Sequence, residues 1–353
     1  MFRWRPCQDV IPCQPNQQSD LHRERKYNIM KKFIALVLSL VLLCSVTAYA
    51  ENVTVGVIQY ATHPSLDNCY EGFVKGLAEG GYVEGDNLTL DFQNAMADMG
   101  NSDMQAKNMA AKQENLLVGI ATPAAMSAYA ATREAGTPVV FVAVSDPVAA
   151  GIINDVEKPG TNCTGVSDIL NLEEQLKLIR AFLPEATTIG VIYTTSEPNS
   201  ISNLERLEKL APDYGFTIVS VGISSAAEVG SAAATLVSKD VDCVNNFTDN
   251  NVVENLSVLL HATDEAGIPV FGSEVEQVVN GCLATQGIDY VEVGRAAGLM
   301  AAKILNGEAD PADMPVLEVS EVTPAYNSEV AARLGLTLPA DYADAADVTK
   351  SAE

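Results

Sequence analysis

Short apolar runs rich in β-branched residues alternate with amphipathic segments along most of the chain, at intervals of about 25–30 residues. This alternation is typical of βαβ units, in which a helix connects two parallel strands, so the predicted fold class is α/β with parallel sheets. The pattern predicts strands at residues 53–59, 88–93, 117–121, 138–144, 188–193, 217–221, 241–247, 269–271 and 282–285. It predicts helices at residues 68–79, 103–114, 124–134, 173–182, 200–210, 226–236, 252–266 and 290–305.

Two rounds of this alternation follow one another, the first ending near residue 165 and the second near residue 280. The sequence thus predicts two similar lobes in tandem, with crossings at the glycine-containing segments 160–165 and 281–287. A return of the helix at 290–305 to the first lobe would make both lobes discontinuous, as in a hinged protein. We expect lobe 1 at 53–166 plus 285–310, lobe 2 at 167–284 plus 311–337, and a frayed tail at 338–353.

Residues 30–50 have the features of a bacterial export signal. Lys31 and Lys32 precede an apolar run at 33–46, and residues 48–50 (Ala-Tyr-Ala) form a small-x-small cleavage site. The apolar run is shorter than the ~20 residues that a membrane-spanning helix needs. The sequence therefore predicts a mature protein that begins near Glu51 and lies outside the cytoplasm, in the periplasm or at the cell surface.

Two features near the N-terminus qualify this picture. Cys44 could carry a lipid anchor, but Leu43 stands before it where lipoproteins have a small residue. Residues 1–29 show no periodicity and precede a second candidate start at Met30. We expect them to be an upstream extension that is not part of the fold.

Acidic residues dominate the charge of the chain. There are 46 Asp and Glu against 21 Lys and Arg, a formal net charge of −25, and the first fifty residues are net basic, so the remainder is more acidic still. Nucleic acids and anionic membrane surfaces bind proteins through clustered Lys and Arg. The composition therefore argues against both partners. No heptad or long apolar stripe indicates self-association, and we expect a monomer.

Polar side chains gather at the predicted ends of the strands, where open α/β sheets bind their ligands. Thr122 and Pro123 can begin a helix whose free N–H groups favour an anion such as a carboxylate. Hydroxyl, amide and carboxylate groups at the other strand ends supply what a small zwitterion needs, with Asp249 or Glu274 facing an ammonium. The competing interpretation is helix capping for Thr122 and Asp249, ordinary turn chemistry for the other strand ends, and an edge or core aromatic for Tyr60. The candidates are Gln59, Tyr60, Thr122, Ser145, Asp146, Ser196, Asn199, Ser200, Thr248, Asp249 and Glu274.

Signatures of catalysis and of cofactor binding are missing from the sequence. It has no Gly-x-Ser-x-Gly, P-loop, Gly-x-Gly-x-x-Gly or His-Glu-x-x-His motif. Beyond residue 50 it has two histidines, His63 and His261, and four widely spaced cysteines without a Cys-x-x-Cys, so a zinc site of the usual kind is not indicated. We interpret His63, which precedes Pro64, as a residue that fixes a loop. We expect no cofactor, no metal and no enzymatic activity.

Eight short stretches, in order along residues 53–318, resemble the substrate-binding proteins of ABC importers, in the group that binds the aromatic amino acids tryptophan, phenylalanine and tyrosine. The stretches are residues 57–60 (Val-Ile-Gln-Tyr), 63–67 (His-Pro-Ser-Leu-Asp), 81–85 (Gly-Tyr-Val-Glu-Gly), 121–125 (Ala-Thr-Pro-Ala-Ala), 144–148 (Val-Ser-Asp-Pro-Val), 165–168 (Gly-Val-Ser-Asp), 248–250 (Thr-Asp-Asn) and 287–290 (Gly-Ile-Asp-Tyr). The resemblance implies a type I periplasmic-binding fold, with two Rossmann-like lobes joined by a three-crossing hinge and a ligand closed between them.

The resemblance also implies roles for individual residues. Thr122, Ser145 and the amide of Ala124 would hold the ligand carboxylate, while Asp249 and Glu274 would meet its ammonium. Ser196, Asn199 and Ser200 would approach from the second lobe. The chain departs from the family at position 274, where Asp is common, and the added methylene leaves the identity of the ligand open.

The function that this resemblance implies is extracytoplasmic capture of a small amino acid, aromatic in the resembled group, and its delivery to a membrane permease and its ATPase. A binding protein for another small solute, such as a branched or modified amino acid or a nucleoside-like compound, is an alternative. A receptor subunit that feeds a sensor kinase would share the fold. An exported hydrolase is the third interpretation.

Overall fold

The computed structural model describes residues 52–319 and 322–350. From Asn52 onward the chain forms one compact unit. The predicted upstream extension, the export signal and Cys44 lie outside the described residues. Within the described ranges, no helix has both the length and the apolar character needed to cross a membrane.

The first lobe is built on a six-stranded, all-parallel sheet with the strand order β11-β5-β4-β3-β1-β2. Every residue of β3 and β4 is buried, as expected for central strands that are covered on both faces. The edge strand β2 is largely exposed or half-buried. The strands are β1 (Val53–Gln59), β2 (Leu88–Asn94), β3 (Leu116–Ile120), β4 (Val139–Val142), β5 (Cys163–Ser167) and β11 (Leu317–Glu318).

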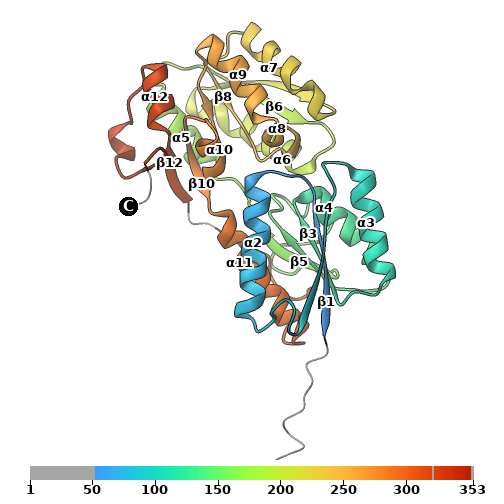
Figure 1. Ribbon diagram of the computed structural model, residues 1–353. Helices are drawn as coiled ribbons and strands as arrows, with labels where there is room; N and C mark the ends of the chain where they lie inside the picture. Colours follow the sequence, from blue (N-terminus) through green and yellow to red (C-terminus); the bar gives the residue numbers. More distant parts are fainter. Residues whose placement is uncertain (1–51, 320–321, 351–353) are drawn as a thin grey trace, which may run out of the picture. The chain divides into compact units, whose positions relative to one another are not determined.

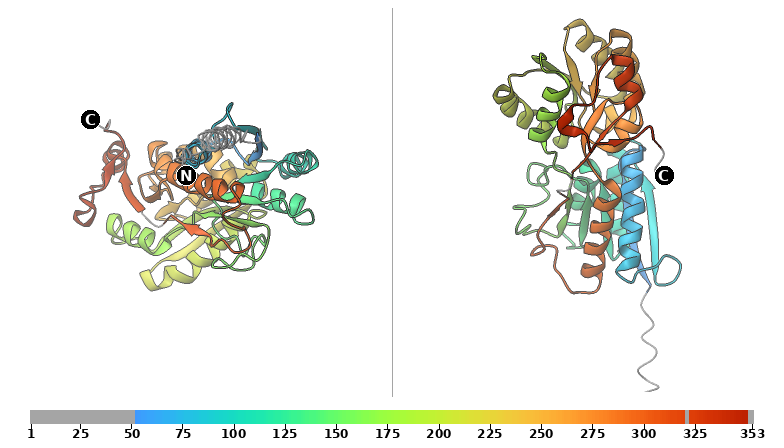
Figure 2. Two further views of the ribbon diagram at one scale, coloured as in Figure 1. Left: turned by 90° about the horizontal axis from the view of Figure 1, so that it is seen from below. Right: turned by 90° about the vertical axis from the view of Figure 1, so that its left-hand side faces the viewer.

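Four helices belong to this lobe, and two of them, α2 and α11, lie side by side (Figures 1 and 2). Glycines make this contact possible: a Cβ added at Gly72 or Gly76 on α2, or at Gly294 or Gly298 on α11, would collide with the backbone of the other helix. The helix that follows the second round of alternation therefore packs on the first lobe. The helices are α2 (Pro64–Glu79), α3 (Met99–Ala111), α4 (Thr122–Thr132) and α11 (Tyr290–Leu305).

The second lobe is built on a four-stranded parallel sheet with the order β7-β6-β8-β9. Its strands are β6 (Thr188–Thr194), β7 (Thr217–Ile223), β8 (Cys243–Asn245) and β9 (Val270–Phe271). Its helices are α5 (Leu172–Phe182), α6 (Pro198–Leu210), α7 (Val229–Ser238), α8 (Asn250–Glu254), α9 (Leu256–Ala266) and α10 (Val275–Val279), with short 3-10 turns at Ala211–Tyr214 and Ala226–Glu228.

A third, small sheet adjoins the second lobe. In it β10 (Ala284–Ile288) pairs antiparallel with β12 (Val322–Tyr326), and β12 pairs parallel with β13 (Ala346–Asp347). The strand β10 is joined to the second lobe by a backbone hydrogen bond, in which the amide of Gly272, just after β9, donates to the carbonyl of Ala284 at 3.0 Å. The helix α12 (Ser328–Leu334) and a 3-10 turn (Ala340–Tyr342) complete this region.

The chain passes between the two lobes three times. The first crossing runs from β5 in the first lobe to α5 in the second. The second crossing runs from β10 back to α11 in the first lobe. The third runs from β11, in the first sheet, to β12, which pairs with β10. Each lobe is therefore discontinuous in sequence. The strand β11 belongs to the first sheet, although it lies within the range 311–337 that we assigned to lobe 2.

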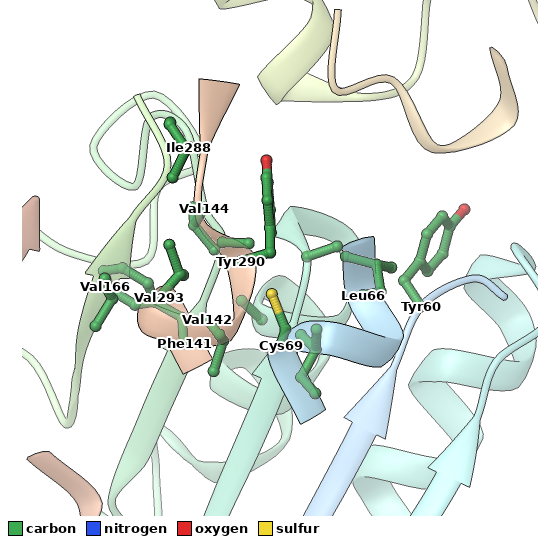
Figure 3. Packing of buried hydrophobic residues seen from close by; sticks show 14 of the residues in the cluster. Tyr60, Leu66, Cys69, Phe141, Val142, Val144, Val166, Ile288, Tyr290 and Val293 are labelled. Carbon is green, nitrogen blue, oxygen red and sulfur yellow. The ribbon is translucent and has the colours of Figure 1, made fainter. Parts of the chain in front are cut away.

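The main apolar core lies around the first sheet and its helices and continues into the second lobe. Figure 3 shows Phe141, Val142 and Val166 from the sheet packed with Val293 from α11 and Cys69 from α2. All of these side chains are fully buried. In the same view the hydroxyls of Tyr60 and Tyr290 point away from the packed core. The four cysteines among the described residues, Cys69, Cys163, Cys243 and Cys282, are buried thiols.

Other segments also differ from the sequence-based expectation, among them the predicted helix at 252–266, which is divided into α8 and α9. Residues 160–165 were expected to be a crossing, but Cys163–Ser167 forms the buried strand β5, which its small residues did not signal. The C-terminal segment was expected to fray, but β13 pairs with β12, and Val348 donates to the carbonyl of Tyr326 at 3.0 Å.

Candidate ligand-binding site

A cavity lies between the two lobes, and the unoccupied space within and around it, open solvent included, is about 320 Å³. Its walls come from segments that follow the strands of both sheets, together with the starts of α2 and α11. This is the place where open α/β sheets bind ligands. The lining residues are His63, Ser65, Leu66, Ala121, Thr122, Ala143, Ser145, Asp168, Asn199, Thr248, Asn250, Val253, Glu274, Gln277 and Tyr290.

The backbone of the cavity wall is strained at two alanines. Ala121, between β3 and α4, has φ 75° and ψ 156°, a region that almost only glycine occupies. Ala143, just after β4, has φ 56°. Strain of this kind costs about 1–3 kcal/mol per residue and is concentrated at functional sites. The turn at Ala121 allows α4 to begin directly at Thr122, which lines the cavity.

Buried polar atoms without a hydrogen-bond partner are concentrated in this cavity. Most buried polar atoms in folded proteins are hydrogen-bonded, and each one that is not costs about 1–3 kcal/mol. The concentration therefore indicates a site that a bound molecule completes. The atoms are Nδ1 and Nε2 of His63, Oγ of Ser65, Oγ1 of Thr122, Oδ1 of Asn199 and Oγ1 of Thr248.

Two buried carboxyl groups face the cavity, and none of its lining residues is Lys or Arg. Asp168 accepts hydrogen bonds from Tyr290 at 2.7 Å and from Ser145 at 2.9 Å. Burial raises the pKa of Asp168, although these two hydrogen bonds oppose the rise. Burial also raises the pKa of Glu274, which accepts a hydrogen bond from the amide of Glu276 at 3.2 Å. The lining thus favours a ligand that brings a positive charge.

A further carboxyl group, Glu197, lies behind the cavity and orients two of its lining amides. It accepts hydrogen bonds from Nδ2 of Asn199 at 3.0 Å and from Nδ2 of Asn250 at 2.7 Å. Burial raises the pKa of Glu197, and the negative charge of Asp249 raises it further. Both amides are therefore held in place from the side away from the ligand.

Five of the predicted site residues line the cavity: Thr122, Ser145, Asn199, Thr248 and Glu274. Ser145 differs from expectation in one respect, because its hydroxyl proton is donated to Asp168. Its remaining lone pairs can accept a hydrogen bond from a ligand.

The other predicted residues do not belong to the lining, and Asp249 is the most informative of them. Its carboxylate is fully buried and accepts hydrogen bonds from the backbone and hydroxyl of Thr194, from the hydroxyl of Ser200 and from the amide of Val252. Asp249 thereby caps α8, which is the competing interpretation stated above. Ser200 is likewise committed to Asp249.

The remaining predicted residues contact other parts of the protein. Gln59 donates to Asp67 at 2.7 Å, and the Tyr60 hydroxyl donates to the carbonyl of Ala97 at 3.1 Å. Ser196 is exposed, and Ala124 is buried in the first turn of α4. Asp146 accepts a hydrogen bond from Ser202 on α6 at 2.8 Å and so joins the lobes.

Several lining residues were not predicted as site residues. Asp168 and Tyr290 lie in motifs on which the resemblance rests, at 165–168 and 287–290, and those motifs were the available signal. His63 was interpreted as fixing a loop. Ser65, Leu66 and Asn250 also lie in motifs of the resemblance, at 63–67 and 248–250, whereas nothing in the sequence context of Val253 and Gln277 separates them from ordinary helix residues.

Comparison with known proteins places the chain in a family. Residues 54–350 match the model of the family described as ABC transporter substrate binding protein. A curated tyrosine-binding protein from Clostridioides difficile (strain R20291) is 38% identical over 275 residues, which cover 78% of this chain and 79% of that protein.

Solved structures show the same two-lobed fold. An ABC domain from Streptococcus pneumoniae in complex with L-Trp matches with a TM-score of 0.81 and 35% identity, over 84% of this chain and 99% of that one. The ligand-free, open structure of a substrate-binding protein with adhesive properties from Clostridium difficile matches with a TM-score of 0.64 and 38% identity, over 83% and 98%. The predicted type I periplasmic-binding fold is confirmed, and the chain belongs to the substrate-binding proteins of ABC transporters.

Proposed function

We propose that the protein captures an aromatic amino acid in the cavity between its lobes and delivers it, unchanged, to a membrane permease with its ATPase. The observation that carries this proposal is that neutral polar groups and acidic groups occupy different parts of the cavity. Unpaired neutral groups at the start of α4 suit a carboxylate, and two buried acids suit an ammonium. A zwitterion is the ligand that satisfies both.

The ligand carboxylate binds at the start of α4. The hydroxyl of Thr122 is 1% exposed and has no hydrogen-bond partner. The amide of Ala124 lies in the first turn of the same helix, where N–H groups have no partner within the helix. Helix N-termini favour anions through these N–H groups and the helix dipole. A carboxylate is therefore bound here without a cationic side chain.

The ligand ammonium binds between Asp168 and Glu274. Asp168 follows β5 of the first lobe, whereas Glu274 precedes α10 of the second lobe. A ligand whose ammonium contacts both acids binds more tightly when the lobes are together, and so stabilises the closed arrangement. Glu274 replaces Asp249 as the second-lobe acid for this role, because the oxygens of Asp249 are committed to Thr194, Ser200 and Val252.

An aromatic side chain is supported by the walls of the cavity and by the relatives. Leu66, Val253 and Tyr290 supply apolar surface beside the polar groups. The structure is more similar to the tryptophan complex than to the open, ligand-free relative, although its sequence is no less similar to the latter. The tyrosine-binding relative supports the same ligand class.

The site of action and the partners form part of this proposal. Family membership supports a role outside the cytoplasm, with a permease and an ATPase as partners. The export signal predicted at residues 30–50 supports the same location. The absence of catalysis and the monomeric state are likewise proposed.

A thermal-shift screen of the purified protein against the common amino acids tests the ligand class. A ligand at a hundred times its dissociation constant adds about 2.7 kcal/mol of stability, so the melting temperature should rise with aromatic amino acids. Thr122→Val should lose most of that rise while keeping the melting temperature of the free protein. A rise with nucleosides or sugars and none with any amino acid would refute the proposal.

A further inference from the structure

The side chain of His63 is buried, but its ring makes fewer hydrogen bonds than buried polar groups usually make. The residue is 8% exposed, and neither ring nitrogen has a partner in good hydrogen-bond geometry, although the side chain of Asn250 lies close enough to oppose the lowering of the pKa of His63. Its backbone is fixed, because its carbonyl accepts from the amides of Leu66 and Asp67 at 3.1 Å each, and Pro64 follows it at the start of α2. The imidazole is therefore held at the cavity wall with both nitrogens unpaired.

The imidazole of His63 is neutral at physiological pH. Burial lowers the pKa of His63 to about 4. A neutral imidazole offers one N–H donor and one nitrogen acceptor. A hydroxyl group, which both donates and accepts one hydrogen bond readily, matches this pair of functions.

The position of His63 separates it from the three anchors on the first lobe, although the fourth anchor, Glu274, lines the same cavities as His63. A second cavity, of about 610 Å³ counted with its open part, adjoins the first, and both are lined by His63, Ser65, Val253, Glu274 and Gln277. Thr122, Ser145 and Asp168 line the inner cavity only. His63 therefore lies at the end of the inner cavity next to the outer one.

We infer that His63 is the residue that reads the ligand's side chain, by hydrogen bonding to the hydroxyl of a hydroxylated aromatic amino acid such as tyrosine. This inference rests on the proposed function. With the carboxylate at α4 and the ammonium between the acids, a side chain that extends toward the outer cavity would reach His63. A phenylalanine ring would leave both nitrogens of His63 unpaired, and sites built to bond a substrate hydroxyl strongly reject analogues that lack it.

The test compares dissociation constants for L-tyrosine, L-phenylalanine and L-tryptophan in the parent protein, His63→Leu and Thr122→Val. The parent should bind tyrosine at least about 10-fold more tightly than phenylalanine, with tryptophan, a donor only, in between. His63→Leu should weaken tyrosine about 10–100-fold and leave phenylalanine equal or tighter, so that the preference disappears. Thr122→Val should weaken the binding of tyrosine and of phenylalanine by a similar factor, because Thr122 contacts the carboxylate that both amino acids have.

The outcomes separate the two proposals. Equal binding of tyrosine and phenylalanine by the parent overturns the role of His63, and so does an equal loss of both in His63→Leu, which would place His63 on the shared carboxylate or ammonium. If none of the three amino acids binds the parent, the proposed function itself fails. If His63→Leu does not fold, His63→Gln decides: the tyrosine preference should fall several-fold, and an unchanged preference overturns the inference.

Discussion

Ser202 on α6 donates a hydrogen bond of 2.8 Å to Oδ2 of Asp146, and this bond ties the second lobe to the first. Asp146 is itself held in place, because its Oδ1 accepts from the amide of Ala149 at 2.9 Å. Asn68 on α2 makes a second bond between the lobes, to Oε1 of Glu276. None of these four side chains lines the inner cavity. The two interlobe hydrogen bonds form only when the lobes are together. They therefore favour the closed arrangement over the open one without contacting the ligand.

Removing both ties should shift the protein toward the open arrangement. For Asn68→Ala/Ser202→Ala we expect ligand affinity to fall about 5–30-fold, because two hydrogen bonds of about 1 kcal/mol each favour the binding-competent state. Small-angle scattering of the ligand-free variant should give a larger radius of gyration than the parent. Ser231→Ala removes a hydroxyl on α7 that donates to the carbonyl of Glu228 in the preceding turn; it is the control and should change neither quantity. Unchanged affinity and radius in the double variant would show that the ties do not set the equilibrium.

Asp249→Asn should lower stability rather than ligand affinity. The carboxylate accepts hydrogen bonds from Thr194, Ser200 and Val252, and an amide NH₂ would face donors in place of one acceptor oxygen. We expect the free energy of unfolding to fall by about 1–3 kcal/mol. Chemical denaturation measures the stability and calorimetry measures the affinity.

Glu274→Gln is the matched comparison for Asp249→Asn. It should lower affinity at least about 10-fold, because deleting one partner of a buried charge pair costs several kcal/mol. If Asp249→Asn lost affinity and Glu274→Gln did not, the assignment of the ammonium site would be reversed.

Glu114 predicts a pH dependence of stability that is independent of the ligand. Its side chain is 2% exposed, both oxygens lack hydrogen-bond partners, and Oε2 occupies the space that a Cβ at Gly56 would fill. The ammonium of Lys112 lies 4.0 Å from Oε1 and only partly opposes the rise in the pKa of Glu114. Burial, reinforced by the nearby charge of Asp91, raises the pKa of Glu114 from 4.5 to about 7. The folded protein therefore holds this proton more tightly than the unfolded chain. The associated stability is present below pH 4.5 and is lost as the pH rises through 7.

Glu114→Gln removes this titration and should be more stable than the parent at pH 8, by about 1–3 kcal/mol, but not at pH 4.5. Urea unfolding at the two pH values measures the difference. Glu71→Gln, at an exposed position on α2, should leave the parent's pH dependence intact. A parent and a Glu114→Gln variant with parallel pH profiles would contradict the prediction.

The contact between α2 and α11 makes a sharp prediction about glycine. A Cβ at Gly294 would collide with the carbonyl oxygen of Cys69, which cannot move without shifting α2. Gly294→Ala should therefore lower the free energy of unfolding by at least about 1–3 kcal/mol, or prevent folding. At Gly230 on α7 a Cβ meets only the side chain of Val258, so Gly230→Ala should gain up to about 1 kcal/mol from helix propensity. Similar effects of the two substitutions would contradict this account.

Much of the fold could be predicted because the central strands are continuous apolar runs, and β1 has the predicted bounds, Val53–Gln59. The strand β5 was missed because Cys-Thr-Gly-Val-Ser offers one branched apolar residue, and its strand character comes from pairing with β4 and β11. The site was predicted only in part. The strand-end rule located Thr122 and Glu274, but it cannot say which of two acids turns inward.

That choice depends on tertiary neighbours. Asp249 points away from the cavity because Thr194 and Ser200, which are distant in sequence, supply donors for its oxygens. Asp168 faces the cavity because Tyr290 brings its hydroxyl from another crossing of the hinge. Neither partnership leaves a periodic signal in the sequence.

The central claim, that the cavity binds a zwitterion through both of its charged groups, is tested most directly by titration calorimetry with three related compounds. These are L-tyrosine, tyramine, which lacks the carboxylate, and 3-(4-hydroxyphenyl)propionate, which lacks the ammonium. We predict that L-tyrosine binds and that each analogue binds at least about 100-fold more weakly, because one leaves the hydroxyl of Thr122 without a partner and the other leaves the buried acids Asp168 and Glu274 without a counter-charge. An analogue that binds as tightly as L-tyrosine would contradict the account.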